Sequence, residues 1–553
     1  MRSAFRRSVF CWSALAGLLL GLLALGPALG RGFVLSYDMV FVPDPPFSSA
    51  LLGLSGGPAR PVPSDAVVAV AARVLPADVL QKVILLAIFV LACSGAAALL
   101  ADCWQARLGS RPPLLASLAA GVFYAWNPYL AERLVMGQWA MLLGYAGLPW
   151  VLRQLCAGPV RVGRARLAAA LLPAAIGGFA GMAITGLAAV PAAVARGSRP
   201  GERAARLGVV IAGCALLSLP WIIPSLIEPV RADPAGASLF AARADTPFGS
   251  LGSLALLSGI WNAEAAPVGY GGVTAACWLL VVAAAGAGYL LVARPMRLCP
   301  GLGAAGLIGL AVAALGVTAP GRSLLSDMIA AWAGFAVLRD GQQYVAALAL
   351  VEAIGFGTGV AWVLRRARAR TSTGTGAGTA TAGAALGVLA LLAPVLLLPG
   401  MAWGATGRLH AVQYPADWLT ARRLIDSDPH QGTVLLLPWA QYRRYPWNGG
   451  EAVFDPWSRL LSRAVVYNDA LTVGSQTVGQ ESAASIWLNR VIGQTGPLTG
   501  RLLAAGVRYL VIDAGPLLGQ APAALPASAR LPGAHVIIDS RDLVVFVLAE
   551  GRG

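Results

Sequence analysis

The stretch from Gly32 to Asp65 holds the first acidic residues of a chain that is otherwise strongly apolar. It reads GFVLSYDMVFVPDPPFSS, continues through a Gly/Pro-rich run, and contains Asp38, Asp44 and Asp65. Carboxylates beside a bilayer are costly unless they face water or serve a site. Asp38 follows the first apolar run closely enough to stay at the membrane interface. We therefore expect Asp38 to be the centre of chemistry on a lipid-borne substrate.

Each acid in this stretch also has a purely structural interpretation. Asp38 is also suited to capping a turn. Asp44 stands in the sequence PDPP and suits a turn residue. Asp65 follows Ser64 and precedes an apolar run, so either residue suits a helix N-cap. Asp44 and Asp65 are therefore secondary candidates for the site.

A second polar segment, NPYLAERLVMGQW at 127–139, contains a further acid and a cation. Glu132 is a third secondary acid, and Arg133 suits a phosphate ligand because its guanidinium presents a planar fork of donors. Gln138 and Trp139 offer a hydrogen bond and a stacking face to a substrate. The alternatives are a salt bridge for Arg133 and a place in the interfacial aromatic belt for Trp139.

A third polar segment, AVLRDGQQY at 336–344, stands at the start of another apolar run. Arg339 is the second candidate phosphate ligand, and Gln342 and Gln343 are candidate substrate-binding residues. Tyr37, next to Asp38, offers an aromatic face to a sugar or a lipid chain. These three segments must be brought together by the elements between them if they form one site.

Those elements are predicted to be membrane helices. The chain has 553 residues, of which 57% are hydrophobic and only 12% charged, whereas soluble domains carry about 25% charged residues. Apolar runs approaching the roughly 20 residues that cross a bilayer recur along it. We expect a polytopic α-helical membrane protein with eleven spans, at 9–30, 83–102, 114–126, 139–152, 167–178, 182–194, 207–227, 273–293, 302–317, 344–364 and 384–403.

The charge pattern predicts the orientation of these helices. The net charge of +16 comes almost wholly from Arg, and Lys82 is the only lysine. The arginines cluster in short loops that all fall on one side of the predicted spans, which the positive-inside rule assigns to the cytoplasm. The N-terminus is then cytoplasmic and the C-terminal region extracytoplasmic. Nucleic acid is excluded as a partner, since no basic stripe with interleaved aromatic residues occurs.

The predicted domains are 1–404, a membrane domain, and 405–553, an extracytoplasmic α/β domain. In the first, residues 31–82 form an outer loop with a helix lying along the membrane surface after Asp65. In the second, β-branched runs predict strands and amphipathic runs predict helices. The strands are expected at 432–439, 507–513, 535–539 and 542–549, and the helices at 414–427 and 482–505.

Metal-ligand and disulfide patterns are weak in this chain. The seven Cys lie in or beside predicted spans, and neither they nor the three His show ligand spacing. The stretch 439–457 is dense in Trp and Tyr, which suits a carbohydrate-binding face and a protein core equally. No metal ligand is assigned from these patterns.

The arrangement resembles the GT-C superfamily of membrane glycosyltransferases. The resemblance includes a first helix, an acid-bearing outer loop with a surface helix, many further spans and a C-terminal outer domain. The segments 127–139 and 336–344 are similar to segments of actinobacterial membrane proteins of the arabinofuranosyltransferase-like or mannosyltransferase-like kind. LLLPWAQYRRYPWNG (435–449) and AAGVRYLVID (504–513) look like the outer domain of the same group.

The resemblance implies transfer of a sugar from a polyprenyl-phosphate donor to a cell-envelope glycan or lipid acceptor at the plasma membrane. It assigns Asp38 as the base for the acceptor hydroxyl and cationic side chains to the departing phosphate. The family's acid pair has no adjacent counterpart here, because Asp38 and Asp44 are six residues apart, so a divalent metal stays open. The alternatives are a non-catalytic transporter or flippase and an assembly protein for lipid-linked precursors.

Overall fold

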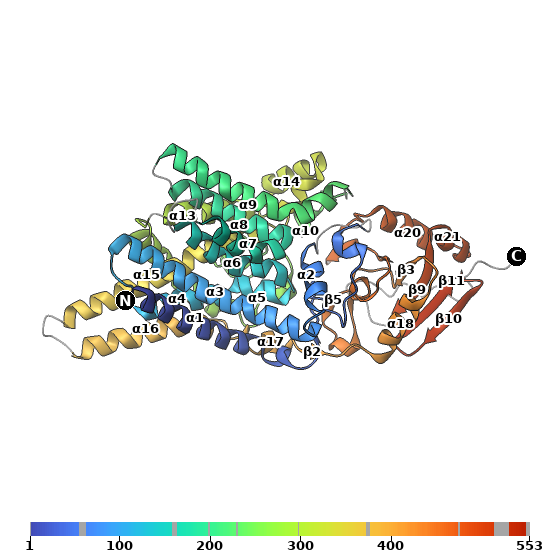
Figure 1. Cartoon of the computed structure of the whole chain (residues 1–553), viewed down its shortest axis with the longest axis horizontal. Coiled ribbons are helices and arrows are strands. Elements are labelled where there is room, and N and C mark those ends of the chain that lie inside the picture. Colours follow the sequence, from blue (N-terminus) through green and yellow to red (C-terminus); the bar gives the residue numbers. More distant parts are fainter. Residues whose placement is uncertain are drawn as a thin grey trace.

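A computed structural model of the chain describes residues 2–54, 62–156, 163–196, 199–227, 231–296, 298–371, 377–473, 476–513 and 530–548. Each of the eleven predicted spans coincides with a helix, and together these helices form one bundle (Figure 1). They are α1 (Arg2–Leu25), α3 (Ala77–Leu108), α4 (Leu114–Ala125), α6 (Trp139–Cys156), α7 (Arg164–Ile176), α8 (Gly178–Arg196), α9 (Pro200–Ile227), α12 (Gly272–Gly288), α13 (Cys299–Leu315), α15 (Ala346–Thr371) and α16 (Ala377–Leu397).

The count of eleven membrane spans is not confirmed. Within the described residues, six helices are long and apolar enough to cross a membrane. A seventh is added if α13 and α14 (Ala319–Ala331), which meet at a bend of 88°, form one broken span. Helices such as α4, with 12 residues, and α7, with 13, fall short of the bilayer thickness. Apolar composition marked these segments correctly as helices but did not distinguish a spanning helix from a shorter one inside the bundle.

The helices approach one another closely at glycines. A Cβ added at Gly121 of α4 would lie 2.5 Å from the carbonyl oxygen of Cys93 in α3. One added at Gly144 of α6 would lie 2.5 Å from the Cα of Gly181 in α8. Small residues at helix crossings let backbones approach and favour van der Waals packing, which is the main attraction between helices in lipid. These close backbone contacts hold the helices of the bundle in fixed positions relative to one another.

The surface helix predicted after Asp65 is shorter than expected. Helix α2 (Ser64–Ala71) stops before Pro76, and the residues from Ala77 onward belong to α3. Pro76 ends the first segment because a proline within a helix removes a backbone hydrogen bond. The N-cap of α2 is Pro63, which makes no side-chain cap, so the N-cap interpretation of Ser64 and Asp65 is wrong.

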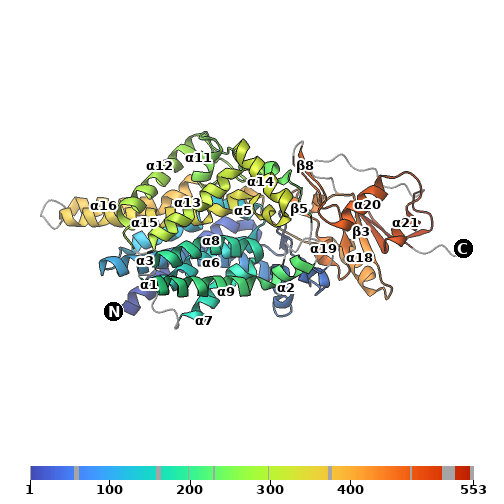
Figure 2. The same ribbon diagram turned by 90° about the horizontal axis from the view of Figure 1, so that it is seen from above.

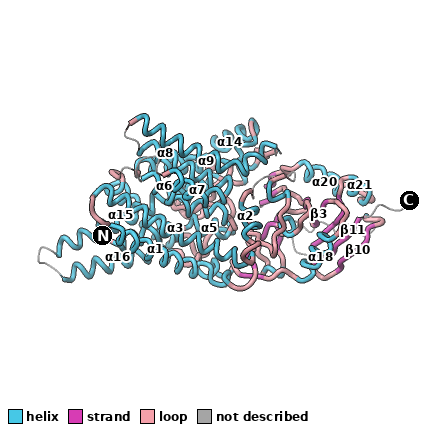
Figure 3. The backbone as a smooth tube through the Cα atoms, viewed as in Figure 1, coloured by secondary structure: helices cyan, strands magenta, loops and turns pink. Residues whose placement is uncertain are grey.

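The C-terminal region forms a mixed sheet of five strands in the order β10-β11-β9-β3-β6. Strand β3 pairs in parallel with β9 and β6, whereas β11 pairs antiparallel with β9 and β10. Figures 1 and 3 show the strands gathered at the end of the molecule away from the N-terminus. The predicted strands are confirmed as β3 (Thr433–Leu437), β9 (Val507–Asp513), β10 (Ala534–Asp539) and β11 (Leu543–Leu548), with β6 (Val465–Val466) at the edge.

Helices flank this sheet where the sequence predicts them. The segment 414–427 is α18 (Ala416–Ser427), and the segment 482–505 is divided into α20 (Ala483–Gly493) and α21 (Thr499–Ala504). Two hairpins project beside the sheet, β4 (Tyr442–Arg444) with β5 (Ala452–Phe454), and β7 (Leu471–Val473) with β8 (Gln476–Val478). In Figure 2 the bundle and the sheet region lie end to end, with α2 and β5 near their junction.

The first loop, defined here as residues 30–54, is held by hydrogen bonds from both parts of the molecule. Its strand β1 (Phe33–Val34) pairs with β2 (Ala411–Val412), which follows the last helix of the bundle. The Gln81 side chain of α3 bonds both the N–H and the carbonyl of Val34, at 2.9 and 2.7 Å. Because these partners are backbone groups or a buried amide, the loop has a fixed register on the bundle.

A glycine in the turn between α5 (Pro128–Val135) and α6 makes this docking possible. Gly137 has a φ of +71°, and an added Cβ would lie 2.1 Å from the carbonyl oxygen of Ser36. A side chain there would push the first loop away from the turn.

We expect Gly137→Ala to lower the free energy of unfolding by more than the 1–2 kcal/mol that a left-handed alanine costs. Thermal unfolding in detergent measures the effect. Gly109→Ala is the matched control, because Gly109 also has a positive φ, +64°, but an added Cβ meets nothing within 4 Å. Equal destabilisation by the two variants would contradict the tight docking of the loop.

Candidate functional site

Asp38 lies where the first loop meets both the bundle and the C-terminal region. The Tyr442 hydroxyl of β4 donates to Asp38 Oδ1 at 2.5 Å. The Gln138 amide, in the turn before α6, faces Asp38 Oδ2 at 3.5 Å, a long contact. The backbone N–H of Asp38 donates to the carbonyl of Met136 at 3.1 Å. The half-buried Asp38 is thereby held by groups from two other segments, the turn between α5 and α6 and strand β4.

Tyr37 fixes the backbone beside Asp38. Its N–H donates to the carbonyl of Ala452 at 2.6 Å, and its carbonyl accepts from the N–H of Phe454 at 2.8 Å. Its φ is +43°, a conformation that costs a non-glycine residue on the order of 1–3 kcal/mol and is common at functional sites. The geometry therefore gives Tyr37 a positioning role, and its role in substrate binding stays a prediction.

The hydroxyl of Tyr37 is tied to the loop before α12. It donates to Glu264, which also forms an ion pair with Arg444 at 2.7 Å. Burial, and next the hydrogen bond to Glu264, raise the pKa of Tyr37 to about 12. The phenol therefore keeps its proton and remains a donor at neutral pH.

Arg459 is a member of this site that the sequence did not indicate. It lies in α19 (Trp457–Leu460), and its Nε donates to Asp65 Oδ2 at 2.5 Å. Its Nη1 is buried and has no hydrogen-bond partner within the described residues. Burial lowers the pKa of Arg459, but the charge of Asp65, its hydrogen bond to Arg459 and, to a smaller extent, the charge of Asp38 outweigh this effect and raise that pKa.

Asp65 is therefore the counter-ion of Arg459. Burial raises the pKa of Asp65, and the adjacent Arg459 opposes that rise. No feature of the local sequence distinguishes Arg459 from the other arginines, because its partner lies 394 residues away in the chain.

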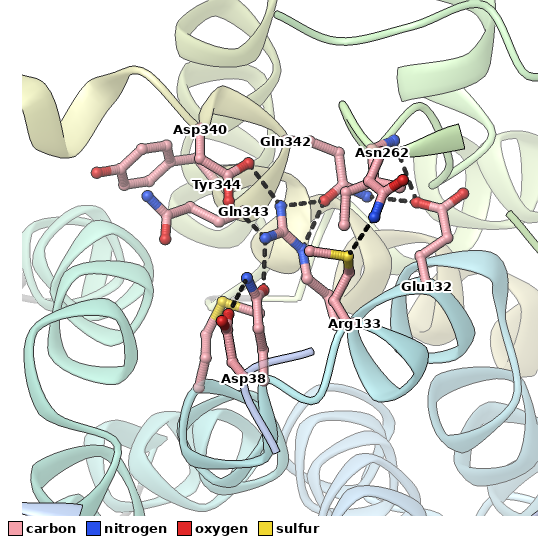
Figure 4. A network of polar contacts seen from close by, with 12 residues as sticks. Asp38, Glu132, Arg133, Asn262, Asp340, Gln342, Gln343 and Tyr344 are labelled. Atoms are coloured by element: carbon pink, nitrogen blue, oxygen red, sulfur yellow. Dashed lines mark hydrogen bonds and ion pairs between the residues drawn. The ribbon is translucent and has the colours of Figure 1, made fainter. Parts of the chain in front are cut away.

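Arg133 is the centre of a buried polar network (Figure 4). Its guanidinium bonds both carboxylate oxygens of Asp340, at 2.6 and 2.9 Å. Its Nε donates to Gln342 Oε1 at 2.8 Å, and its Nη1 donates to Gln138 Oε1 at 2.7 Å. The salt bridge considered as the alternative for Arg133 is present, and its role as a phosphate ligand stays a prediction that this geometry does not favour.

Glu132 closes the other end of this network. Its Oε2 accepts from Gln342 Nε2 at 3.1 Å and from the N–H of Ile260 at 3.3 Å, while its buried Oε1 has no partner within the described residues. Burial, and next the charge of Asp245, raise the pKa of Glu132 well above its ordinary value. Burial thus favours the protonated form of Glu132, which is separated from Asp38 by Gln342, Arg133 and Gln138.

The other predicted site residues lie around this network. Arg339 pairs with Glu481 of the C-terminal region at 3.0 Å and stacks on Phe240. The Gln343 amide donates to the carbonyl of Val337 at 3.0 Å, away from Arg133.

Two more predicted residues lie on or against the first loop. Trp139 is buried against Phe41, with ring centroids 5.1 Å apart. Asp44 is exposed, its φ is +44°, and its carbonyl accepts from Arg422 at 2.6 Å, as expected of a turn residue. The structure thus brings Asp38, Gln138, Arg133, Gln342 and Glu132 into one connected network.

The hairpin that carries Tyr442 is anchored by a fully buried charge cluster. Arg443 contacts Asp455 at 2.7 Å and Asp513 at 3.3 Å, and it donates to the carbonyls of Leu437 and Pro438. Aromatic side chains of the stretch 439–457 pack beside this cluster, so most of them serve the core. Tyr442 is different, because its hydroxyl reaches Asp38.

Two carboxylates share one guanidinium in this cluster, which makes its stability depend on pH. Burial raises the pKa of Asp513 to about 7, against the opposing effect of Arg443. Because this folded-state pKa lies above the unfolded value near 4, the stabilisation is complete below about pH 4. It is lost as pH rises through about 7.

We expect Asp513→Asn to remove this contribution. Relative to the wild type, the variant should gain on the order of 3 kcal/mol in free energy of unfolding between pH 4 and pH 8. Thermal unfolding of both proteins across that range measures the difference. A constant offset between them would contradict a raised pKa of Asp513 in the folded protein.

No group of three or more His, Cys, Asp or Glu side chains placed to hold a metal ion occurs within the described residues. The acids closest to the site already have protein partners, namely Tyr442 for Asp38 and Arg459 for Asp65. A divalent metal therefore finds no preformed set of protein ligands there, and its involvement stays open.

Comparisons with known proteins give a match of fold. No family model and no curated protein matches the sequence. A cryo-EM structure of the mycobacterial arabinofuranosyltransferase AftD aligns with a TM-score of 0.60 and 16% identity, covering 98% of this chain and 40% of that one. A mutant of AftD aligns with a TM-score of 0.58, also at 16% identity, covering 98% of this chain and 42% of its own.

This chain therefore has the fold of the aligned part of AftD. The resemblance predicted from the sequence is therefore confirmed at the level of fold. The chain spans less than half the length of the AftD chains that it matches. The six apolar helices of spanning length agree with a location in a membrane.

Proposed function

We propose that the protein is a membrane glycosyltransferase that moves a sugar from a polyprenyl-phosphate donor to a hydroxyl of a cell-envelope glycan or lipid. The observation that carries the proposal is the placement of Asp38 between Tyr442 and Gln138, within electrostatic reach of the half-buried Arg459. A base for the acceptor and a cation for the departing phosphate are the two groups that such a transfer needs. The AftD-like fold supports the same reaction class.

In the proposed reaction, the Asp38 carboxylate takes the proton of the acceptor hydroxyl. The acceptor oxygen then forms a bond to the anomeric carbon, and the bond from that carbon to the phosphate oxygen breaks. The polyprenyl phosphate leaves with the electron pair, and the Arg459 guanidinium balances its negative charge. Tyr442 and Gln138 hold the carboxylate in place.

We place this site on the extracytoplasmic side of the membrane. The start of α1, the end of α15 and the start of α16 lie at the end of the bundle opposite the C-terminal region (Figure 1). That end carries arginines at Arg6, Arg107 and Arg365, as the positive-inside rule expects of a cytoplasmic face. A donor lipid in the outer leaflet would then enter beside the first loop.

The role of Asp38 is tested by Asp38→Asn, assayed with radiolabelled polyprenyl-phosphoryl arabinofuranose and, in parallel, polyprenyl-phosphoryl mannose. We expect transfer to fall at least about 100-fold, because general-base catalysis contributes typically 10²–10⁴-fold. Asp44→Asn is the matched control from the same loop and should transfer at the wild-type rate. Undiminished transfer by Asp38→Asn would remove Asp38 from the chemistry, and donor binding without transfer by the wild type would favour a transporter or an assembly protein.

The phosphate ligand is tested by comparing Arg459→Gln with Arg339→Gln. We expect Arg459→Gln to raise the KM for the donor about 10- to 100-fold, because charge-assisted hydrogen bonds are worth about 1.5–3 kcal/mol. Arg339→Gln should change this KM little, since Glu481 already engages its guanidinium. A larger rise in the donor KM for Arg339→Gln than for Arg459→Gln would instead assign phosphate binding to Arg339.

A further inference from the structure

Arg133 has no N–H group left for a ligand. The guanidinium carries five N–H donors. Five hydrogen bonds, to Asp340, Gln342 and Gln138, use all of them (Figure 4). Asp340 takes one donor from each terminal nitrogen, Gln342 takes Nε and the second donor of Nη2, and Gln138 takes the second donor of Nη1. The side chain is fully buried. This saturation points to a function exerted through its neighbours.

The neighbours in question are two glutamine side chains, whose orientation Arg133 determines. A guanidinium can only donate, so each amide must turn its oxygen toward Arg133 and its NH2 group away. For Gln138 the NH2 group then faces Asp38 Oδ2, at 3.5 Å. For Gln342 it faces Glu132 Oε2, at 3.1 Å. A flipped amide would set N–H against N–H and leave buried donors unpaired, which costs about 1–3 kcal/mol each.

Asp340 makes this orientation possible without adding net charge beside Asp38. Its carboxylate neutralises Arg133 through two parallel hydrogen bonds, and its side chain is only 20% exposed. Asp38 therefore meets a neutral amide donor from Gln138, and the nearby cationic charge is that of Arg459.

We propose that Arg133 is a positioning residue that locks Gln138 as a hydrogen-bond donor to Asp38. The proposal rests on the proposed function of Asp38 as the base. Tyr442 holds Oδ1 and Gln138 holds Oδ2, so the remaining lone pairs of the carboxylate are directed to the acceptor hydroxyl. Catalytic contacts that are long in a free enzyme shorten when substrate is bound. The 3.5 Å contact is of that kind.

The first experiment needs no turnover. The extent of carbodiimide modification of Asp38 is measured as a function of pH by peptide mass spectrometry, which gives a midpoint pH of modification. The full-length proteins compared are the wild type, Gln138→Glu and Gln138→Met. In Gln138→Glu a carboxylate accepts from Arg133 and faces Asp38, so the midpoint of modification should move up by about one pH unit. In Gln138→Met the midpoint should move by less, since a donor is lost but no charge is added.

The control for the charge change is Gln476→Glu, at an exposed position in β8, which should match the wild type. Equal midpoints for wild type and Gln138→Glu would overturn the proposal. Because this measurement is independent of transfer, a wild type that modifies as expected but transfers no sugar would refute the proposed function and leave the orientation of Gln138 intact.

The second experiment separates positioning from phosphate binding. Arg133→Lys keeps the charge but cannot supply the five donors in a planar fork. We expect kcat to fall about 100-fold, the size of effect that a misplaced catalytic group produces, with the donor KM within about twofold of wild type. A rise in KM at unchanged kcat would assign Arg133 to the phosphate and overturn the positioning role. Thermal unfolding shows whether Arg133→Lys is folded. If it is not, the modification midpoints of the Gln138 variants test the positioning role.

Discussion

The candidate site depends on the backbone clamp around the first loop. Ser36, Tyr37 and Asp38 together exchange hydrogen bonds with the turn after α5 on one side and with β5 on the other. These contacts place the Asp38 carboxylate without using its side chain. A flexible loop would present the same acid over a range of positions, and misplacement of a catalytic group by about 1 Å is enough to cost two orders of magnitude in rate. The strained conformation of Tyr37 is tolerated because bonds from both parts surround it.

Three arginines near the candidate site differ in how their donors are used. Arg133 and Arg443 are fully buried. All five donors of Arg133 have acceptors, and Arg443 is held by ion pairs with two carboxylates and by hydrogen bonds to two backbone carbonyls. Arg459 has one acid partner and a buried nitrogen without one. Burying an unpaired donor is unfavourable unless something binds there. The same residue type therefore serves as a structural anchor at two positions and as the proposed ligand of an anion at the third.

Local sequence predicted the elements well because helix and strand periodicity is a local property. The eleven apolar runs are helices, and the four β-branched runs of the C-terminal region are strands. The predicted number of eleven spans is not confirmed, since a short helix inside a bundle such as α4 is as apolar as one that crosses lipid. The network residues Arg133, Gln138 and Gln342 were indicated by two polar motifs. Arg459 was not indicated, because its place in the site depends on its contact with Asp65, which only the tertiary fold brings near.

The clamp also sets an order of events during biosynthesis. Asp38 emerges from the ribosome long before Tyr442, Phe454 and Arg459 have been translated. Until the last quarter of the polypeptide has folded, the acid has neither its aromatic donor nor its cation. A nascent or truncated chain can therefore insert its helices before the proposed site is complete.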